Sequence, residues 1–140
     1  MFKSILISVK SQIIFLSKTD NKFYKYNEED TPSEVHLTNG IIGQVYKKKF
    51  ELFVEDTAKS KYYNCNIDLM TSSSLITKPV FDLYTNNILA IIQSEYTQTN
   101  HNININVLQN NEIKYLDQEI LTLFCSCLSK ALTINRKNNL

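Results

Sequence analysis

The two glycines of this 140-residue chain constrain its fold more than any other sequence feature. Both lie in the stretch NGIIGQVYKKKFELFVED (residues 39–56), as Gly40 and Gly43. Glycine inside a helix costs about 1 kcal/mol relative to alanine, so two glycines at helical spacing need a physical reason. We expect a helix that is capped by Asn39 and whose two glycines share one face. At that face the backbone should approach a neighbour closely, either the sheet beneath or a ligand above.

Length and composition predict a single domain over residues 1–140. The chain is 43% hydrophobic and 21% charged, a balance typical of a globular protein. Its net charge of +1 indicates neither nucleic acid nor an anionic membrane as a partner. No apolar stretch approaches the roughly 18 residues that a membrane-spanning helix needs, and three cysteines do not make a disulfide framework. We therefore expect a cytoplasmic protein without a separate catalytic or output domain.

Six segments have the pattern of β-strands. They are rich in β-branched and aromatic residues, and a turn-forming Thr19-Asp20-Asn21 between the first two predicts a hairpin. The segments are residues 12–17, 22–27, 34–37, 50–55, 74–81 and 87–96. This order of elements predicts an α+β fold with an antiparallel sheet of about six strands and with helices packed on one side.

The C-terminal segment has helical periodicity. One set of residues predicts the buried stripe of a long amphipathic helix: Leu116, Ile120, Phe124, Cys127, Leu128 and Ala131. A polar set falls on the opposite side: Gln118, Thr122, Ser126, Ser129 and Thr133. Before the helix, the Asn-rich residues 97–111 predict either a short strand, from the alternation of Ile103, Ile105 and Val107, or a loop.

Several motifs resemble those of the GAF domain, the sensor module of cyclic-nucleotide phosphodiesterases, phytochromes and many signalling proteins. GIIGQV (residues 40–45) is similar to the family's G-I-x-G-x-V signature, and SLITKPV (residues 74–80) to its S-[LI]-L-x-x-P-[ILV] strand. Residues 115–119 stand where the family has F-T-x-E-D. The resemblance implies a GAF core over residues 12–134, a short N-terminal helix at 1–10 in place of the usual long one, and a polar tail at 135–140.

The resemblance also places a ligand pocket over the sheet, between the helix after Asn39 and the polar segment after Asp56. Tyrosines there can stack on a purine, while amides and the helix start can bind its edge or phosphate. The lining residues would be Thr38, Asn39, Asp56, Tyr62, Tyr63, Asn64, Asp68 and Thr71. The alternative is that the two tyrosines cover the edge of the core and that the polar side chains are solvated.

The nucleotide signature of the family is incomplete in this chain. Phosphodiesterase GAF domains that bind cyclic nucleotides carry an N-K pair where this chain has Glu95-Tyr96. Their downstream F-x-x-x-D-E is replaced at all three positions, by Tyr115, Glu119 and Ile120. We therefore expect a regulatory or structural subunit that acts through protein–protein contacts in a signalling or cytoskeletal/ciliary assembly. The alternative is a small-molecule sensor that binds a cyclic nucleotide.

The family's first and last helices commonly form a dimer contact, so a shortened first helix would expose part of the last one. We expect Leu121, Leu123, Leu132 and Ile134 to form this interface with a protein partner or a second copy. The alternative is that the Asn-rich segment folds over these residues. Lys47-Lys48-Lys49 would follow a helix end, as a solvated face or as a contact for an acidic partner.

No catalytic or metal-binding pattern is evident in the sequence. One GAF subfamily reduces free methionine sulfoxide with cysteines in the region of Cys65, but such chemistry needs a second, resolving cysteine. Cys125 and Cys127 are about 200° apart on a helix and cannot bridge. His36 and His101 have no neighbouring ligand pattern. We expect no enzyme activity, no cofactor and no metal.

Overall fold

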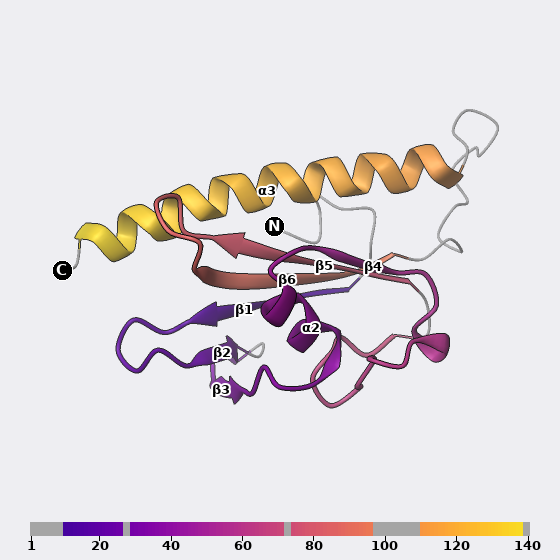
Figure 1. Cartoon of the computed structure of the whole chain (residues 1–140), viewed down its shortest axis with the longest axis horizontal. Helices are drawn as coiled ribbons and strands as arrows, with labels where there is room; N and C mark the ends of the chain where they lie inside the picture. The colour runs from indigo at the N-terminus through magenta and orange to yellow at the C-terminus, as the bar shows by residue number, and fades with distance from the viewer. Residues whose placement is uncertain (1–9, 27–28, 72–73, 97–109, 139–140) are drawn as a thin grey trace.

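The computed structural model describes residues 10–26, 29–71, 74–96 and 110–138, with side chains left out for residues 96, 110–120, 137 and 138. Along the chain the elements are β1 (Ser11–Leu16), β2 (Phe23–Tyr26), β3 (Pro32–Val35), α2 (Gly40–Lys48), β4 (Leu52–Val54), the 3₁₀ turn η1 (Thr57–Lys59), β5 (Ser74–Phe81), β6 (Ile88–Tyr96) and α3 (Asn110–Asn138) (Figure 1). The predicted helix at residues 1–10 and the alternating isoleucines of the Asn-rich segment lie outside the described residues, apart from Lys10.

The six strands form one antiparallel sheet in the order β3-β2-β1-β6-β5-β4. The two longest strands, β5 and β6, lie next to each other and pair from Ser74↔Tyr96 to Phe81↔Ile88. Strand β1 pairs with the other edge of β6, with Ile14 opposite Ile91. The predicted α+β fold with a six-stranded antiparallel sheet is therefore confirmed.

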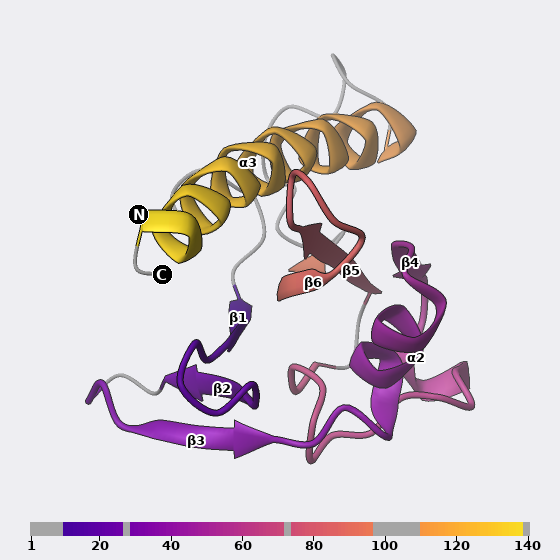
Figure 2. The same cartoon turned by 60° about the vertical axis from the view of Figure 1, so that its left-hand side comes forward.

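The two helices lie on opposite faces of the sheet (Figure 2). Side chains alternate between faces along a strand, so Leu75 and Ile91 face α2 while their neighbours Ile76 and Ile92 face α3. The prediction that the helices pack on one side is therefore wrong. Both faces of the central strands are apolar in the sequence, and that pattern already favours a covering layer on each face.

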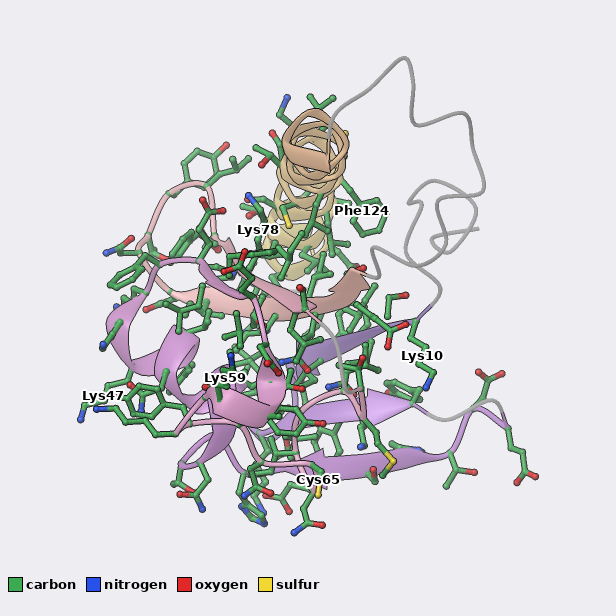
Figure 3. The ribbon with its side chains drawn as sticks, turned by 90° about the vertical axis from the view of Figure 1, so that its right-hand side faces the viewer. Lys10, Lys47, Lys59, Cys65, Lys78 and Phe124 are labelled. Atoms are coloured by element: carbon green, nitrogen blue, oxygen red, sulfur yellow. The ribbon has the colours of Figure 1, made fainter. Side chains whose placement is uncertain are left out.

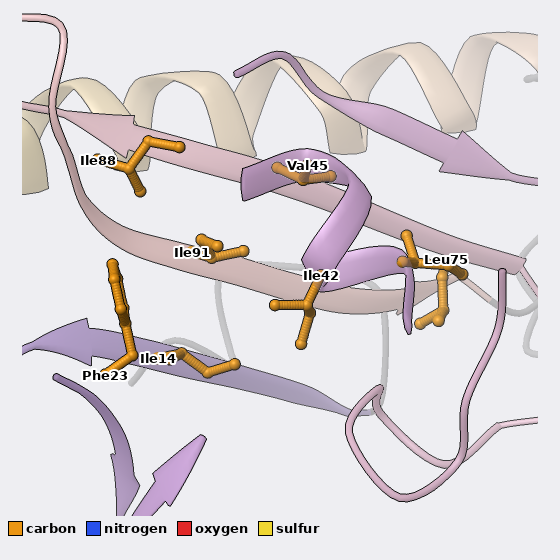
Figure 4. Packing of buried hydrophobic residues seen from close by; sticks show 8 residues of the cluster. Ile14, Phe23, Ile42, Val45, Leu75, Ile88 and Ile91 are labelled. Carbon is orange, nitrogen blue, oxygen red and sulfur yellow. The ribbon is translucent and has the colours of Figure 1, made fainter. Parts of the chain in front are cut away.

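Helix α2 closes the first core cluster. Its buried Ile41, Ile42 and Val45 pack against side chains from four strands, namely Ile14, Phe23, Leu75, Ile88 and Ile91 (Figure 4). Apolar residues at helical positions 41, 42 and 45 put one face of this nine-residue helix on the sheet. The helix is thereby held across the centre of the sheet, with each end near a different group of loops.

Helix α3 covers the other face, but its buried stripe differs from the predicted one. Leu121 is fully buried against Ile76, Val80, Ala90 and Ile92. Two residues of the predicted polar side, Ser129 and Thr133, are also buried, whereas two of the predicted stripe, Cys127 and Ala131, are exposed.

Hydrogen bonds to the end of β5 and to the turn that follows it explain why α3 turns a different side toward the sheet than the sequence predicts. The Ser129 hydroxyl donates to the carbonyl oxygen of Phe81, and Thr133 Oγ1 accepts from the backbone N–H of Leu83 at 3.0 Å. These contacts hold the inner side of α3 against the end of β5 and the turn that follows it. The helix continues to Asn138, so the polar tail predicted at 135–140 is helical as far as that residue. Among the described residues, neither helix has the length and apolarity needed to span a membrane.

Candidate functional site

Helix α2 begins where the sequence predicts, but Asn39 does not cap it with its side chain. Asn39 occupies the N-cap position and makes no side-chain cap hydrogen bond. The cap comes from Asp68 instead. Asp68 Oδ2 accepts from the backbone N–H of Ile41 at 2.8 Å, and Oδ1 accepts from that of Ile42 at 3.0 Å. A carboxylate from a distant segment therefore satisfies two of the N–H groups that every helix start leaves free.

The Asp68 side chain is buried and accepts two further hydrogen bonds. The residue is 4% exposed, and it also accepts from the Asn64 backbone N–H at 2.9 Å and from Gln93 Nε2 at 3.0 Å. The start of a helix favours an anion because its N–H groups and its dipole both point at the ligand. At α2, the carboxylate of Asp68 occupies that anion position.

This carboxylate accounts for Gly40. A Cβ atom on Gly40 would lie 2.8 Å from Asp68 Oδ2, and Gly40 has a φ of +79°, which only glycine adopts without cost. Gly43 is also crowded, since a Cβ there would lie 3.2 Å from the carbonyl oxygen of Leu37 and from the carbonyl carbon of Thr38. Both glycines therefore lie at close approaches, as predicted. The neighbours are Asp68 and the chain segment that leads into the helix, rather than the sheet or an external ligand.

A row of polar residues across the sheet holds Asp68 in place. Gln12, Gln93 and Thr77 are register partners on β1, β6 and β5. Gln93 Nε2 donates to Asp68 Oδ1 and to Thr77 Oγ1 (3.1 Å). Gln93 Oε1 accepts from Gln12 Nε2 at 2.8 Å and from the Leu69 backbone N–H at 2.6 Å.

Sequence reasoning missed this row, although one signal was available. Gln93 directly follows the apolar residues 88–92 on the central strand β6, and a fully buried glutamine must find hydrogen-bond partners. Its partners lie on other strands and in the loop before β5, so only the sheet register identifies them.

Five of the eight predicted ligand-binding residues line one surface hollow of about 420 Å³ beside the start of α2. They are Thr38, Asn39, Tyr62, Tyr63 and Asn64. Asp68 is bound to the helix start as described above and does not line this hollow. Asp56 and Thr71 also lie outside the lining. Asp56 caps η1 by accepting from the Ala58 N–H, and the Thr71 backbone bonds to Tyr63 and to Thr57.

The groups expected to bind a purine are engaged within the protein. The Tyr63 hydroxyl donates to the Leu69 carbonyl oxygen (3.1 Å) and accepts from the Thr71 N–H (3.2 Å). The ammonium of Lys61 lies 5.0 Å from the centre of the Tyr62 ring, so the ring already interacts with a cation. Asn64 Oδ1 accepts from the Asn66 N–H.

The cysteines are free and lie apart in the described structure. Cys65, which lines the hollow, and Cys127 are exposed, and Figure 3 shows Cys65 on the opposite side of the molecule from α3. Burial raises the pKa of the Cys125 thiol to about 11, although Lys78 nearby acts to lower it. A raised pKa keeps this thiol protonated at neutral pH and makes it a poor nucleophile. No three potential metal ligands cluster among the described residues.

The four residues predicted as an interface have different environments. Leu121 belongs to the core, so its assignment to an interface is wrong, and Leu132 is half-buried against the same cluster. Leu123 and Ile134 are exposed, at 67% and 56%. The prediction for Leu121 failed because it depended on the phase of α3, which the bonds of Ser129 and Thr133 determine.

Comparison with solved structures identifies the fold. No protein-family model matches the sequence, and no curated protein matches it significantly. The GAF domain of an Acinetobacter phosphoenolpyruvate-protein phosphotransferase superposes with a TM-score of 0.59 at 13% identity, over 93% of this chain and 74% of that one. The GAF domain of A. aeolicus nlh2 in an inactive state superposes with a TM-score of 0.60 at 13% identity, over 89% of this chain and 74% of that one. A third structure of a GAF domain superposes with a TM-score of 0.54 at 12% identity, over 86% of this chain and 63% of that one. The chain therefore has the GAF fold that the motifs predict.

Proposed function

We propose that this chain is a non-catalytic, GAF-like regulatory subunit that acts by contacting another protein, or a second copy of itself, in a larger signalling assembly. The observation that carries the proposal is an apolar stripe on the outer side of α3. Leu123 and Ile134 are mostly exposed there, and Cys127 and Ala131 between them are exposed as well. These spacings of four, four and three residues place the four side chains on one face of the helix.

The stripe has the form of a helix-docking surface. Helix α3 has 29 residues and is therefore about 43 Å long, and its inner side is used for packing on β5 and β6. A second row of apolar side chains, on the outer side, does not pack into the core formed by the described residues. Contact with an apolar face of another helix would remove the four exposed side chains of the stripe from water.

The alternative function, binding of a cyclic nucleotide beside α2, is less well supported. The cyclic phosphate would compete with the Asp68 carboxylate for the N–H groups of Ile41 and Ile42. The aromatic groups of the hollow are also engaged, since Tyr62 faces a lysine and Tyr63 bonds to the loop. A ligand would have to displace a buried side chain with four hydrogen bonds before it could use the helix start.

The proposal is tested by introducing charge on the stripe. Leu123→Asp combined with Ile134→Asp should leave the isolated chain folded, as measured by circular dichroism, because both side chains are exposed in the single chain. The variant should sediment as a monomer where the parent is a dimer, or lose a stoichiometric partner on purification. Phe50→Asp with Met70→Asp is the matched control, because it places two charges at exposed apolar positions outside α3. A parent that is monomeric and purifies alone, or a stripe variant that still associates, would contradict the proposal.

A further inference from the structure

A second hollow lies at the opposite end of α2. It has a volume of about 610 Å³ and is formed by the end of α2, the β1–β2 and β5–β6 turns, and the last turns of α3. Figure 1 shows the β5–β6 turn beside the C-terminal part of α3. The size falls within the range of small-molecule sites. None of the residues predicted from the sequence as ligand-binding lines it.

Three cationic side chains line this hollow, Lys47 and Lys49 from the end of α2 and Arg136 from α3. Figure 3 shows Lys47 at the outer edge of the molecule. The ion pairs found among the described residues involve other lysines, Lys22 and Lys78. Within the described structure, none of the three lining cations is neutralised by an ion pair.

One carboxylate, Asp82, also lines the hollow. Its Oδ1 accepts from the backbone N–H groups of Tyr84 (2.8 Å) and Thr85 (3.2 Å), so it is used in shaping the β5–β6 turn. The lining therefore carries three positive groups against one negative group that is already hydrogen-bonded. This balance favours a ligand with more than one negative charge.

The backbone of Lys49 adds a separate observation. Lys49 has a φ of +60°, in the left-handed region, and its N–H donates to the Val45 carbonyl oxygen at 2.8 Å. Glycine is the preferred residue at this position after a helix, and other L-residues pay about 1 kcal/mol or more for the conformation. Folding alone therefore favours glycine here, and what lysine adds is a cation at the hollow.

An aromatic ring lies among these cations. Tyr46 is 41% exposed and lines the hollow. Its ring is held by an edge-to-face contact with Phe23, with the centroids 5.4 Å apart and an interplanar angle of 75°. Phe23 in turn belongs to the core cluster and lies on the same side of the sheet as Ile88 (Figure 4). A tyrosine ring fixed in this way offers a planar surface to a ligand ring.

We propose that this hollow binds a nucleoside di- or triphosphate, with the phosphates against Lys47, Lys49 and Arg136 and the base against Tyr46. Arginine binds phosphate oxygens in a bidentate manner and lysine binds them as a point charge. Inorganic phosphate would occupy only part of the volume and would not use the aromatic ring. The site shares no lining residue with the proposed contact on α3. It lies at the other end of α2 from the hollow near Asp68, and the nine-residue helix between them is about 13 Å long.

The test is calorimetric titration of the full chain with ADP, pyrophosphate and adenosine. We expect ADP to bind, pyrophosphate to bind more weakly and adenosine not to bind. Lys47→Gln with Arg136→Gln should lower the affinity for ADP by about tenfold or more, because two charge-assisted contacts are lost. Tyr46→Ala should lower the affinity for ADP and leave the affinity for pyrophosphate unchanged. The control is Lys59→Gln with Lys61→Gln, which removes two charges elsewhere and should not affect ADP binding.

Two results would overturn the proposal. One is the absence of ADP binding at about 5 mM ADP, because a dissociation constant above that concentration is too weak for specific recognition of a small ligand. The other is an unchanged ADP affinity in a Lys47→Gln, Arg136→Gln variant whose thermal unfolding matches that of the parent. Binding of poly-glutamate without binding of ADP would also contradict it, and would identify the hollow as a contact for an acidic protein segment. None of these results bears on the sedimentation test of the α3 stripe.

Discussion

The two ends of helix α2 differ in whether their polar groups are already used. At the start, the N–H groups of Ile41 and Ile42 are bonded to Asp68, and the helix begins through a glycine that only just accommodates this carboxylate. At the end, the Val45 carbonyl oxygen accepts from the Lys49 N–H, but the charges of Lys47 and Lys49 have no described ion-pair partner. A helix terminus can bind a ligand only through groups that the protein has not already used.

This difference has a consequence for regulation. Since Asp68 is held by donors from α2, from its own loop and from β6, the start of α2 is fixed to the sheet without any ligand. A ligand can shift a conformational equilibrium only if it binds two states with different affinity. Under the proposed regulatory function, a signal would therefore act through α3 or through the basic hollow rather than through the start of α2.

The largest expected effect is that of Asp68→Ala. This substitution removes the acceptor of three backbone N–H groups and one of the two acceptors of the Gln93 amide. It should cost at least about 3 kcal/mol of unfolding free energy in urea. The matched control is Asp56→Ala, which removes an exposed cap of η1 and should cost about 1 kcal/mol. Equal losses for the two variants would mean that Asp68 is only another surface cap.

Next in size are the glycine substitutions. Gly40→Ala should cost about 2 kcal/mol, because it combines the left-handed φ with a contact of 2.8 Å to Asp68 Oδ2. Gly43→Val should cost roughly 1–3 kcal/mol by overpacking against the segment that precedes the helix. A double-mutant cycle of Gly40→Ala with Asp68→Ala should show coupling, since the two residues touch. If the two effects are additive, the cost of Gly40→Ala comes from the left-handed backbone alone and not from contact with Asp68.

At the C-terminal end of α2, a substitution by glycine should stabilise the protein. Lys49→Gly should raise the unfolding free energy by about 1 kcal/mol, because glycine adopts the left-handed conformation without the steric cost that lysine pays. The same variant should bind ADP more weakly than the parent. A lysine-to-glycine change that destabilised the protein would show that Lys49 contributes more to packing than its exposed side chain indicates.

The smallest expected effect concerns pH. The pKa of Cys125 is raised to about 11 from its usual value of 9.0, so the unfolded chain ionises first and the contribution of this thiol to stability falls only above about pH 9. At neutral pH a maleimide should label Cys65 and Cys127 and spare Cys125. Since Cys65 lines the hollow at the start of α2, ADP should not slow its labelling. Protection of Cys65 by ADP would place the nucleotide at the wrong end of the helix.

The sequence predicts the elements of the fold better than their orientation. The strand at 74–81 has its predicted limits, while the one expected at 34–37 lies at Pro32–Val35. Local apolar patterning is enough for such assignments. The face of α3 was predicted wrongly because Ser129 and Thr133 pack inward to bond the β5–β6 connection, and a periodicity that treats polar residues as outward-facing cannot anticipate such contacts.

The candidate site was predictable in its members but not in their roles. Asp68 was identified as a pocket residue from the family resemblance, yet its contact with Ile41 spans 27 residues of sequence. Gln12, Thr77 and Gln93 come together only through the register of three strands. The basic hollow could be predicted only in part. Lys47 and Lys49 are two residues apart in the sequence, whereas Arg136 joins them only because α3 runs to the β5–β6 turn.

Amide hydrogen exchange at Ile41 and Ile42, measured by NMR on the unmodified protein, shows directly whether Asp68 closes the start of α2. The first N–H groups of a helix normally lack intrahelical partners and exchange quickly. Because Asp68 accepts from both N–H groups in a buried site, we expect them to be as protected as amides in β6, and we expect Asp68→Asn to remove much of this protection. Rapid exchange of both amides in the unmodified protein would show that the start of α2 is open, and would contradict the central claim.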